Sequence, residues 1–452
     1  MADYESLRDA HAMEMMASMP ERFARLGWSR EQLRGERERA LREIVAHAQA
    51  RSPWHRARLA ELDAARMTEV DLSRVPVMTK RDLMANFDAI VTDPRLTRDA
   101  AERHLDGLSA DAYLLDEYHV CASGGSSGER GVFVYDRAAW SVVFLSYYRF
   151  LAQRLQDAIG AEPMRVGMVA ADKATHMTAA IGATFRPPGG GITRVPATLP
   201  LARIVDELNT LQPNVLQGYT SIIHQLAHEA DAGRLRIAPR LVATTSEPLL
   251  PEIRAAIARA WRVPVFNGFG STEGLMGGSC RAERGLHLSD DFCIVEPVDG
   301  DGNPVAPGAR AAKVYLTRLY ERTQPLIRYE LTDEVTVLDE PCPCGAQLLR
   351  IDDVQGRLDD AFRYAGDRSV HPFTFRSVLG QEAAIVEYQV RQTVRGAAIQ
   401  VRTAGALDTG RVEEKLRAAL LGAGLADAEV AVTVVPALAR QATGKLRRFI
   451  PL

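Results

Sequence analysis

The chain lacks the features that mark membrane proteins, disulfide-rich secreted proteins and nucleic-acid-binding proteins. Its 452 residues include five cysteines, too few for a disulfide scaffold. The first twenty residues are interrupted by charged side chains, and no apolar run reaches about 18 residues. With 55 basic and 58 acidic residues, the net charge is −3, which provides no basic surface for nucleic acid or membranes. We therefore expect a cytoplasmic protein, monomeric or homodimeric, with a small-molecule partner.

Length and hydrophobic pattern indicate at least two domains. A single domain rarely exceeds about 250–300 residues, and 46% of this chain is hydrophobic. Residues 41–48 carry apolar side chains at helical spacing, and Ser52-Pro53 ends that helix. From about residue 113, short β-rich runs alternate with helical stretches, a pattern typical of an α/β domain with a buried sheet. The strands are expected at 131–135, 165–169, 240–244 and 263–266, and the helices at 201–211, 221–230 and 251–261.

The last third of the chain changes character twice. Residues 295–337 are short segments rich in turns, as in a small β subdomain. After Gly356-Arg357, alternating strand and helix patterns predict a compact α+β domain. We therefore expect an N-terminal domain over 1–357 and a C-terminal domain over 358–452. The C-terminal elements expected are strands at 385–390, 397–401 and 429–435, and a helix capped by Asp408 that ends near Gly422.

The segment Asn267–Gly274, Asn-Gly-Phe-Gly-Ser-Thr-Glu-Gly, combines an aromatic ring, two hydroxyls and a carboxylate in one glycine-flanked turn. Gly268 and Gly270 have no Cβ, so the backbone there can approach a ligand closely. Taken alone, such a turn can also be a structural loop. The combination favours a nucleotide and its Mg²⁺, which prefers oxygen ligands. The roles expected are base stacking for Phe269, phosphate contacts for Ser271 and Thr272, and Mg²⁺ binding for Glu273.

A second turn, residues 122–128, reads Ala-Ser-Gly-Gly-Ser-Ser-Gly. Its backbone N–H groups and small hydroxyls can cradle a phosphate. The turn lacks the Gly-Lys-Ser/Thr of a Walker motif, and Glu129 stands where a basic residue would help. A flexible surface loop is the alternative interpretation.

A third motif, Gln441–Arg448, presents Lys445 beside a glycine near the C-terminus. Such a lysine can reach a negatively charged reacting centre, although a basic terminus is more often simply solvated. Two further turns, 328–333 and 356–360, each place a carboxylate after an arginine. Each turn can clamp ribose hydroxyls and phosphate.

The cysteines provide a candidate metal site. Cys342 and Cys344 form a two-thiolate turn. Cys280 and His287 can complete a tetrahedral Cys₃His set if the intervening chain folds back, although a lone Cys-x-Cys is often structural without metal. The cysteines expected in the core are Cys121 and Cys293.

Taken in order, these segments resemble the adenylate-forming superfamily (acyl-CoA ligases, adenylation domains and luciferases), and specifically its phenylacetate–coenzyme A ligase branch. The resemblance covers nearly the whole chain, including residues 46–55, 75–83 and 217–221. It implies an α/β fold, with a large multi-subdomain N-terminal adenylation domain and a small mobile α+β C-terminal domain. It also implies an enzyme that uses ATP and Mg²⁺ to convert a carboxylic acid, expected to be aromatic, into acyl-AMP and pyrophosphate. Coenzyme A is the acyl acceptor that the resemblance favours.

The resemblance assigns roles to individual residues. Lys445 is the adenylation lysine, Arg357 contacts ribose or phosphate, and Asp359 is the hinge. Because members of the branch carry zinc at the corresponding location, a structural Zn²⁺ is expected on the four Cys and His residues named above. The acyl pocket is expected at His176, Tyr219 and Gly268, with a satisfied core histidine as the equal alternative for His176. The expected nucleotide site consists of Ser123, Gly125, Ser126, Ser127 and Gly128 in the phosphate loop, Ser246, Glu247, Pro248 and Phe269 around the adenine, Gly270 and Ser271 in the glycine-flanked turn, Thr272 at the α-phosphate, Glu273 at Mg²⁺ and Asp333 on the ribose.

The sequence departs from the family pattern in two respects. Glu129 replaces the lysine of the family's phosphate loop, so the phosphate contacts are expected to differ in detail. Residues 364–372 fit the coenzyme A ligase loop loosely, which leaves the acceptor open. An amine is therefore the second acceptor, which would make the chain an amide synthetase. A non-catalytic nucleotide-binding protein is the third possibility, against which the retained Glu273, Asp333 and Lys445 speak.

Overall fold

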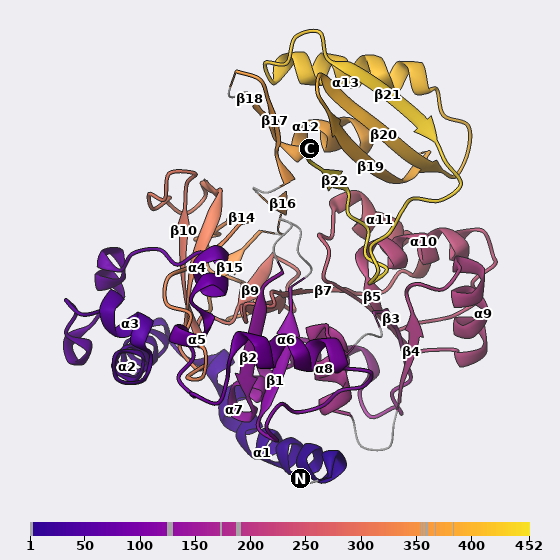
Figure 1. The fold of residues 1–452 in the computed structure, drawn as a ribbon. Helices are drawn as coiled ribbons and strands as arrows, with labels where there is room; N and C mark the ends of the chain where they lie inside the picture. The colour runs from indigo at the N-terminus through magenta and orange to yellow at the C-terminus, as the bar shows by residue number, and fades with distance from the viewer. Residues whose placement is uncertain are drawn as a thin grey trace. The chain divides into compact units, whose positions relative to one another are not determined.

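The computed structural model describes residues 3–123, 130–171, 174–186, 191–352, 354, 356–357, 360–366, 368–382 and 384–452. Contacts divide the chain into two compact units. The first unit comprises residues 1–162, 172–191 and 266–353, and the second comprises 163–171, 192–265 and 354–452. Figure 1 shows the helices and strands of both. Within the part of the chain described, no helix is both long and apolar enough to cross a membrane.

The first unit opens with helices, as the sequence predicts. Ser29 caps α2 (Arg30–Arg51) in a capping box with Gln32. Leu41, Ile44, Val45 and Ala48 are buried in a local core. Ser52 then ends α2 and caps α3 (Pro53–Arg58), whose proline occupies the first helical turn. The other elements of this region are α1 (Tyr4–Ala24), α4 (Lys80–Ala85), α5 (Phe87–Ile90), α6 (Arg98–Gly107) and the 3₁₀ turns η1 (Arg25–Gly27), η2 (Ala64–Arg66) and η3 (Glu69–Arg74).

The centre of the first unit is built on the long helix α7 (Arg137–Ile159). Asp136 caps α7 by accepting the Ala139 N–H at 2.8 Å. Within the helix, Arg149 forms a bidentate ion pair with Asp291 at 2.6 and 2.8 Å, and both side chains are fully buried. The antiparallel pair β1 (Tyr118–Ala122) and β2 (Val132–Asp136) precedes the helix, and α8 (Met177–Thr184) follows it.

Short antiparallel strands complete the first unit. The strand β8 (Met276–Ser279) pairs with β7 (Val265–Gly270) and with β9 (Leu286–Leu288), and β9 pairs with β15 (Arg350–Ile351). A second group joins β10 (Cys293–Val298), β12 (Lys313–Arg318) and β13 (Tyr329–Leu331). The strands β11 (Arg310–Ala311) and β14 (Asp333–Thr336) form a further antiparallel pair. This is the turn-rich β subdomain that the sequence predicts for residues 295–337.

The second unit contains parallel strands in the order β6 (Leu241–Thr245), β5 (Val215–Tyr219), β3 (Val166–Ala170) and β4 (Ile192–Pro196). The residues of β5 and β6 are buried throughout, as in a sheet covered on both faces. Helices α9 (Leu201–Leu211) and α11 (Pro251–Trp261) have the bounds that the sequence predicts, and α10 (Thr220–Asp231) begins one residue earlier.

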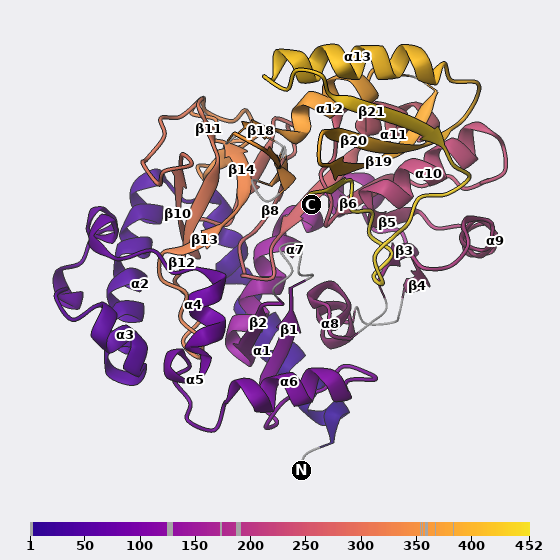
Figure 2. The ribbon, with the colours of Figure 1, turned by 45° about the horizontal axis from the view of Figure 1, so that its top comes forward.

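The C-terminal part of the second unit is an α+β structure with its own hydrophobic core. Its sheet has the order β21 (Glu429–Val434), β20 (Gly396–Thr403), β19 (Ile385–Thr393) and β22 (Phe449–Ile450). Helix α13 (Thr409–Gly422) runs along this sheet in both views (Figures 1 and 2) and is capped by Asp408, as predicted. The remaining elements are β16 (Gly356–Arg357), β17 (Phe362–Tyr364), β18 (Arg368–Val370) and α12 (Pro372–Leu379). The predicted α/β fold class is confirmed.

Candidate nucleotide site and metal centre

The turn between β7 and β8 contains the residues expected to contact a nucleotide. The Ser271 N–H donates to Leu275 O at 3.0 Å, and the Gly274 N–H donates to Ser271 O at 3.0 Å. The Ser271 hydroxyl accepts the Leu275 N–H at 3.2 Å, so this side chain closes the turn itself. Gly274 has a φ of +94°, a conformation that favours glycine. The result is a closed turn that carries Thr272 and Glu273 at its tip.

Two tyrosines from other elements hold this turn in place. Tyr135 donates its hydroxyl to Thr272 O at 2.7 Å, and Tyr320 donates to Gly274 O at 2.8 Å. Burial raises the pKa of both phenols, so both hydroxyls stay protonated and can donate. A Cβ at Gly274 would lie 2.3 Å from the Tyr320 hydroxyl, so glycine is required here for space as well as for its φ. The tip of the turn is therefore fixed from two sides.

The strand before this turn is shaped by an aromatic side chain of α7. A Cβ added at Gly268 would lie 2.3 Å from a ring carbon of Tyr147. The absence of a Cβ at Gly268 therefore leaves room for the Tyr147 ring. A ligand contact at this glycine would be an additional role. Phe269 is partly exposed and Gly270 is exposed at the end of β7. An aromatic ring thus lies within reach of solvent beside the turn.

The other candidate residues of the first unit lie on separate elements. The Ser123 hydroxyl accepts the Gly131 N–H at 2.9 Å, and the Ser123 N–H donates to Gly131 O at 2.9 Å, which joins the two ends of the predicted phosphate loop. Gly125, Ser126, Ser127 and Gly128 of that loop lie outside the described residues. His176 is the N-cap residue of α8 and is partly exposed, so it is not a core histidine. Asp333 is buried at the start of β14.

In the second unit, Lys445 lies at the carboxyl end of β5. Its Nζ is 5.3 Å from the centre of the Tyr219 ring, within the range of a cation–π contact. Tyr219 is itself held in place, because its hydroxyl accepts the Ala171 N–H at 2.9 Å. Burial lowers the pKa of Lys445, whereas the nearby Glu247 carboxylate opposes that shift. The predicted adenylation lysine is thus seated in a partly buried, aromatic environment.

Glu247 links this lysine to the start of α10. Its carboxylate accepts the Ser221 N–H at 2.7 Å and the Ser221 hydroxyl at 3.2 Å. A carboxylate at this helix N-terminus is favoured by the helix dipole. The same carboxylate accepts the Leu446 N–H at 2.8 Å, directly after Lys445. Of the other expected residues in this unit, Ser246 has a φ of +67°, Pro248 and Arg357 are exposed, and Asp359 lies outside the described residues.

The four predicted metal ligands are brought together in the first unit. Cys280 follows β8, His287 lies in β9, and Cys342 and Cys344 lie in the loop before β15, with all four ligand atoms within 4.8 Å of one another. The Sγ atoms of Cys280 and Cys342 are 3.5 Å apart, and Cys344 Sγ is 3.3 Å from His287 Nε2. Zn–S bonds of about 2.3 Å and Zn–N bonds of about 2.0 Å place tetrahedral ligands about 3.5–3.8 Å apart, so the donor set fits Zn²⁺.

The surroundings of the cluster also suit a metal. His287 Nδ1 lies 3.1 Å from Leu348 O, which turns the other ring nitrogen toward the thiols. A hydrogen bond from Cys344 is the main cause that lowers the pKa of Cys280, which favours the thiolate form that binds a metal. Because four protein ligands fill a tetrahedron, a metal here would be structural.

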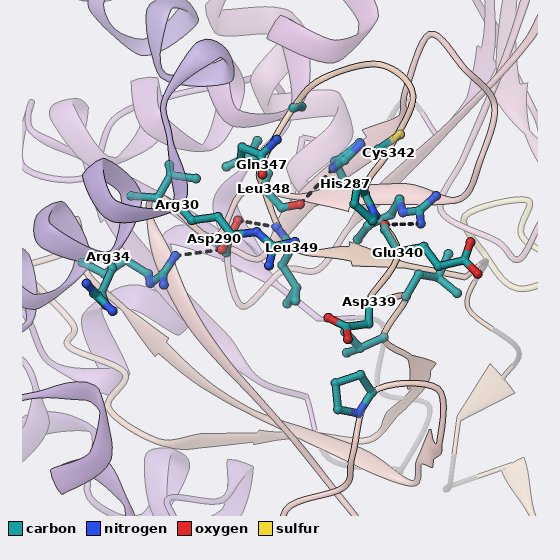
Figure 3. Close-up of a pocket in the computed structure, with 18 residues that line it drawn as sticks. Arg30, Arg34, His287, Asp290, Asp339, Glu340, Cys342, Gln347, Leu348 and Leu349 are labelled. Atoms are coloured by element: carbon teal, nitrogen blue, oxygen red, sulfur yellow. Dashed lines mark hydrogen bonds and ion pairs between the residues drawn. The ribbon is translucent and has the colours of Figure 1, made fainter.

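A cavity of about 350 Å³ lies beside the cluster (Figure 3). Cys342 and His287 line one end of it, and Arg30 of α2 lines the other. At its side, Asp290 pairs with Arg37 at 2.9 Å, and burial raises the pKa of Asp290 to about 6. The cavity gives solvent a route to one side of the cluster.

Several residues that organise these sites were not singled out from the sequence. Tyr135 and Tyr147 lie in apolar segments and appear there as ordinary core residues, and Tyr320 lies among charged residues that match no motif. A second group of residues lies near Lys445, and the sequence contains a signal for it. Ser221 and Gln225 are polar residues four positions apart, on one face of α10, and both are buried. The side chains that these two residues meet come from distant parts of the chain, which no local pattern identifies.

Comparison with known proteins agrees with this architecture. No protein-family model matches the chain. A phenylacetate–coenzyme A ligase from Thermus thermophilus is 26% identical over 403 residues, which cover 85% of this chain and 81% of that protein. The structure of a 2-hydroxyisobutyryl-CoA ligase in the postadenylation state, in complex with R3-HIB-AMP, matches with a TM-score of 0.72 and 20% identity, over 95% of this chain and 91% of that one. An open conformation of the same ligase, in complex with 2-HIB-AMP and CoA, matches with a TM-score of 0.57 and 21% identity, over 92% and 90% of the two chains.

The fold, together with the β7–β8 turn and the seated C-terminal lysine, defines the class of protein. The chain has the fold of an acyl-CoA ligase whose structure holds an acyl-AMP, and its sequence is similar to that of an acid–coenzyme A ligase. Within that class its resemblance is to the phenylacetate–coenzyme A ligase branch, as the sequence predicts.

Proposed function

We propose that the chain is an ATP-dependent ligase that activates an aromatic carboxylic acid as acyl-AMP and transfers the acyl group to coenzyme A. The observation that carries this proposal is the placement of Lys445 over the Tyr219 ring, in a segment that Glu247 holds through the N–H of the next residue, Leu446. A solvated terminal lysine needs no such seat. The sequence similarity to a phenylacetate–coenzyme A ligase supports the choice of acid and acceptor.

In the first half-reaction, a carboxylate oxygen of the acid attacks the α-phosphorus of ATP. The new P–O bond forms as the bond to the β-phosphate oxygen breaks, and pyrophosphate leaves. Lys445 neutralises the charge that develops on the α-phosphate, and Thr272 donates a hydrogen bond to it. The Glu273 carboxylate supplies an oxygen ligand of the kind that Mg²⁺ prefers. Asp333, Arg357 and the loop that starts at Ser123 hold the rest of the nucleotide.

In the second half-reaction, the thiol of coenzyme A attacks the acyl carbon. The C–S bond forms, AMP leaves with both electrons of the C–O bond, and the thiol proton passes to solvent. We propose that residues 358–452 act as a mobile domain that turns about Asp359 between the two half-reactions, while 1–357 retain the acyl-AMP. The acid lies beside His176 and Tyr219, and Tyr147 determines the space at Gly268.

We also propose that Cys280, His287, Cys342 and Cys344 hold a structural Zn²⁺. Their spacing and donor chemistry support this ion. The ion would stabilise the strands β8, β9 and β15, which are only two to four residues long and contain or adjoin the ligands. It takes no part in either half-reaction.

Pyrophosphate release, measured across a panel of aryl, indole and fatty acids, tests the proposal. An aryl acid should give the highest rate, and the product with coenzyme A should be an acyl thioester. An amide formed in preference to the thioester, when both acceptors are offered, would make the chain an amide synthetase. Binding of ATP without pyrophosphate release for any acid would leave a nucleotide-binding protein.

A further inference from the structure

The second unit contains a buried charge network that the proposed reaction does not use. Glu387, on β19, is 2% exposed, and its carboxylate is fully engaged. One oxygen accepts the Gln225 side-chain amide at 2.7 Å and the Arg402 Nε–H at 3.2 Å. The other oxygen accepts an N–H of Arg440 at 2.5 Å. Burial of a carboxylate carries a desolvation cost, which charged and hydrogen-bonding partners offset. The contacts of Glu387 with these partners therefore join β19 to α10.

Arg440 extends this network to the segment that carries Lys445. One of its terminal nitrogens donates to Glu387, and the other donates to the Ser221 hydroxyl at 2.9 Å and to Gly444 O at 3.0 Å. One side chain thus joins β19, α10 and the residue before Lys445. The planar guanidinium suits this task because its donors have a fixed geometry.

The turn between Arg440 and Lys445 is itself rigid. The Gln441 N–H donates to Lys445 O at 3.0 Å, and the Gly444 N–H donates to Gln441 O at 2.8 Å. Gly444 has a φ of +83°, and a Cβ there would lie 2.8 Å from Ala197 Cβ. Beyond the turn, the Leu446 N–H is held by Glu247. Lys445 is therefore anchored on both sides, by Arg440 before it and by Glu247 after it.

We propose that Arg440, held by Glu387, is a positioning residue that latches the Lys445 segment in the arrangement for acyl-AMP formation, and that this latch opens before acyl transfer. This inference rests on the proposed function. Arg440 touches no reacting atom and acts through Lys445. Arg440 and Glu387 contact Ser221 and Gln225 of α10, which lie outside residues 358–452. The rotation proposed above therefore breaks these contacts, and the contacts favour the adenylation arrangement.

The latch makes the two half-reactions respond in opposite directions to its removal. In Arg440→Met, the rate of acyl-AMP formation should fall about 10- to 100-fold. This loss is smaller than is usual for breaking a buried charge pair, because Glu387 keeps Arg402 and Gln225 as partners. The rate of acyl transfer from supplied acyl-AMP to the acceptor should be unchanged or higher, because the latched arrangement no longer competes with the arrangement for acyl transfer. Arg440→Lys, which keeps the charge but not the fork, should recover part of the adenylation rate.

The experiment measures pyrophosphate exchange and acyl transfer separately on wild type, Arg440→Met, Arg440→Lys and Glu387→Gln. Arg391→Met is the matched control, because Arg391 lies on the same strand as Glu387 with an exposed side chain. A selective loss of exchange in Arg440→Met and Glu387→Gln, with the control unaffected, supports the latch. Equal loss of both half-reactions, or loss of neither, overturns it.

A second readout separates the latch from the proposed function. Amide hydrogen exchange at Leu446 reports the bond to Glu247 without any substrate. Protection of this amide in wild type, and at least tenfold faster exchange in Arg440→Met, supports the latch even if no acid is activated. Unchanged protection in Arg440→Met contradicts the latch even if the enzyme makes acyl-AMP.

Discussion

Replacing Lys445 by alanine should abolish most acyl-AMP formation and leave the fold intact. Its ammonium group lies 5.3 Å from the centre of the Tyr219 ring, a contact that contributes about 0.5–2 kcal/mol, and the nearby Glu247 carboxylate also attracts it. Burial already lowers the pKa of Lys445, so its removal also relieves a desolvation penalty. The stability loss should therefore lie at the low end of that range.

The catalytic loss should be much larger than the loss of stability. Removing one charge-assisted contact to the transition state typically costs about 3–4 kcal/mol, or about 10²–10³ in rate. Thermal unfolding and acid-dependent pyrophosphate exchange, measured on the same preparations, separate the two effects. Lys415→Ala is the control, since Lys415 is the other lysine of residues 358–452. Lys415 lies on α13, and it pairs with Glu382. Exchange at the wild-type rate in Lys445→Ala would refute the role of this lysine.

Three further predictions concern the metal, the hinge and the buried histidines. Cys344→Ser should lose stoichiometric zinc and have a lower melting temperature, because the substitution opens a closed tetrahedral site. Metal analysis of protein prepared without chelator checks this prediction, and a zinc-free wild type would contradict it. Asp359→Pro should retain pyrophosphate exchange and lose acyl transfer, because proline fixes φ near about −65°; full retention of transfer would exclude rotation at this residue. Burial lowers the pKa of His55 to about 3, below its unfolded value of 6.5, so the unfolded chain binds the extra proton as the pH falls. Through this residue, the free energy of unfolding should therefore decrease by about 1.4 kcal/mol per pH unit as the pH falls below about 6.5. Urea titrations should show a smaller dependence of this free energy on pH in His55→Gln than in wild type. An unchanged dependence would contradict the prediction.

The sequence predicted local structure well where a single chemical signal sets it. Pro251 at the first helical turn fixes the start of α11, and Asp408 fixes the start of α13. The approach of Cys280 and His287 to Cys342 and Cys344 was predicted from ligand chemistry, because a two-thiolate turn needs two further Cys or His donors to complete a tetrahedral site.

The contacts that hold the sites in place could not be predicted in the same way. The order of the parallel strands depends on how each crossover packs, which no single segment encodes. Tyr135 and Tyr320 support the β7–β8 turn through hydroxyls that a hydropathy pattern counts as core. Glu387 meets Gln225 across 162 residues of sequence, and a buried glutamate in a strand gives no sign of its partner. Long-range polar contacts of this kind determine the seat of Lys445.

Formation of acyl-AMP by this chain is tested by mass spectrometry of the products made from ATP and an aryl acid with no acceptor present. We predict enzyme-bound acyl-AMP with one equivalent of pyrophosphate, and release of AMP when coenzyme A is added. Formation of ADP and phosphate, or no acid-dependent turnover of ATP with any acid of the panel, would contradict the account.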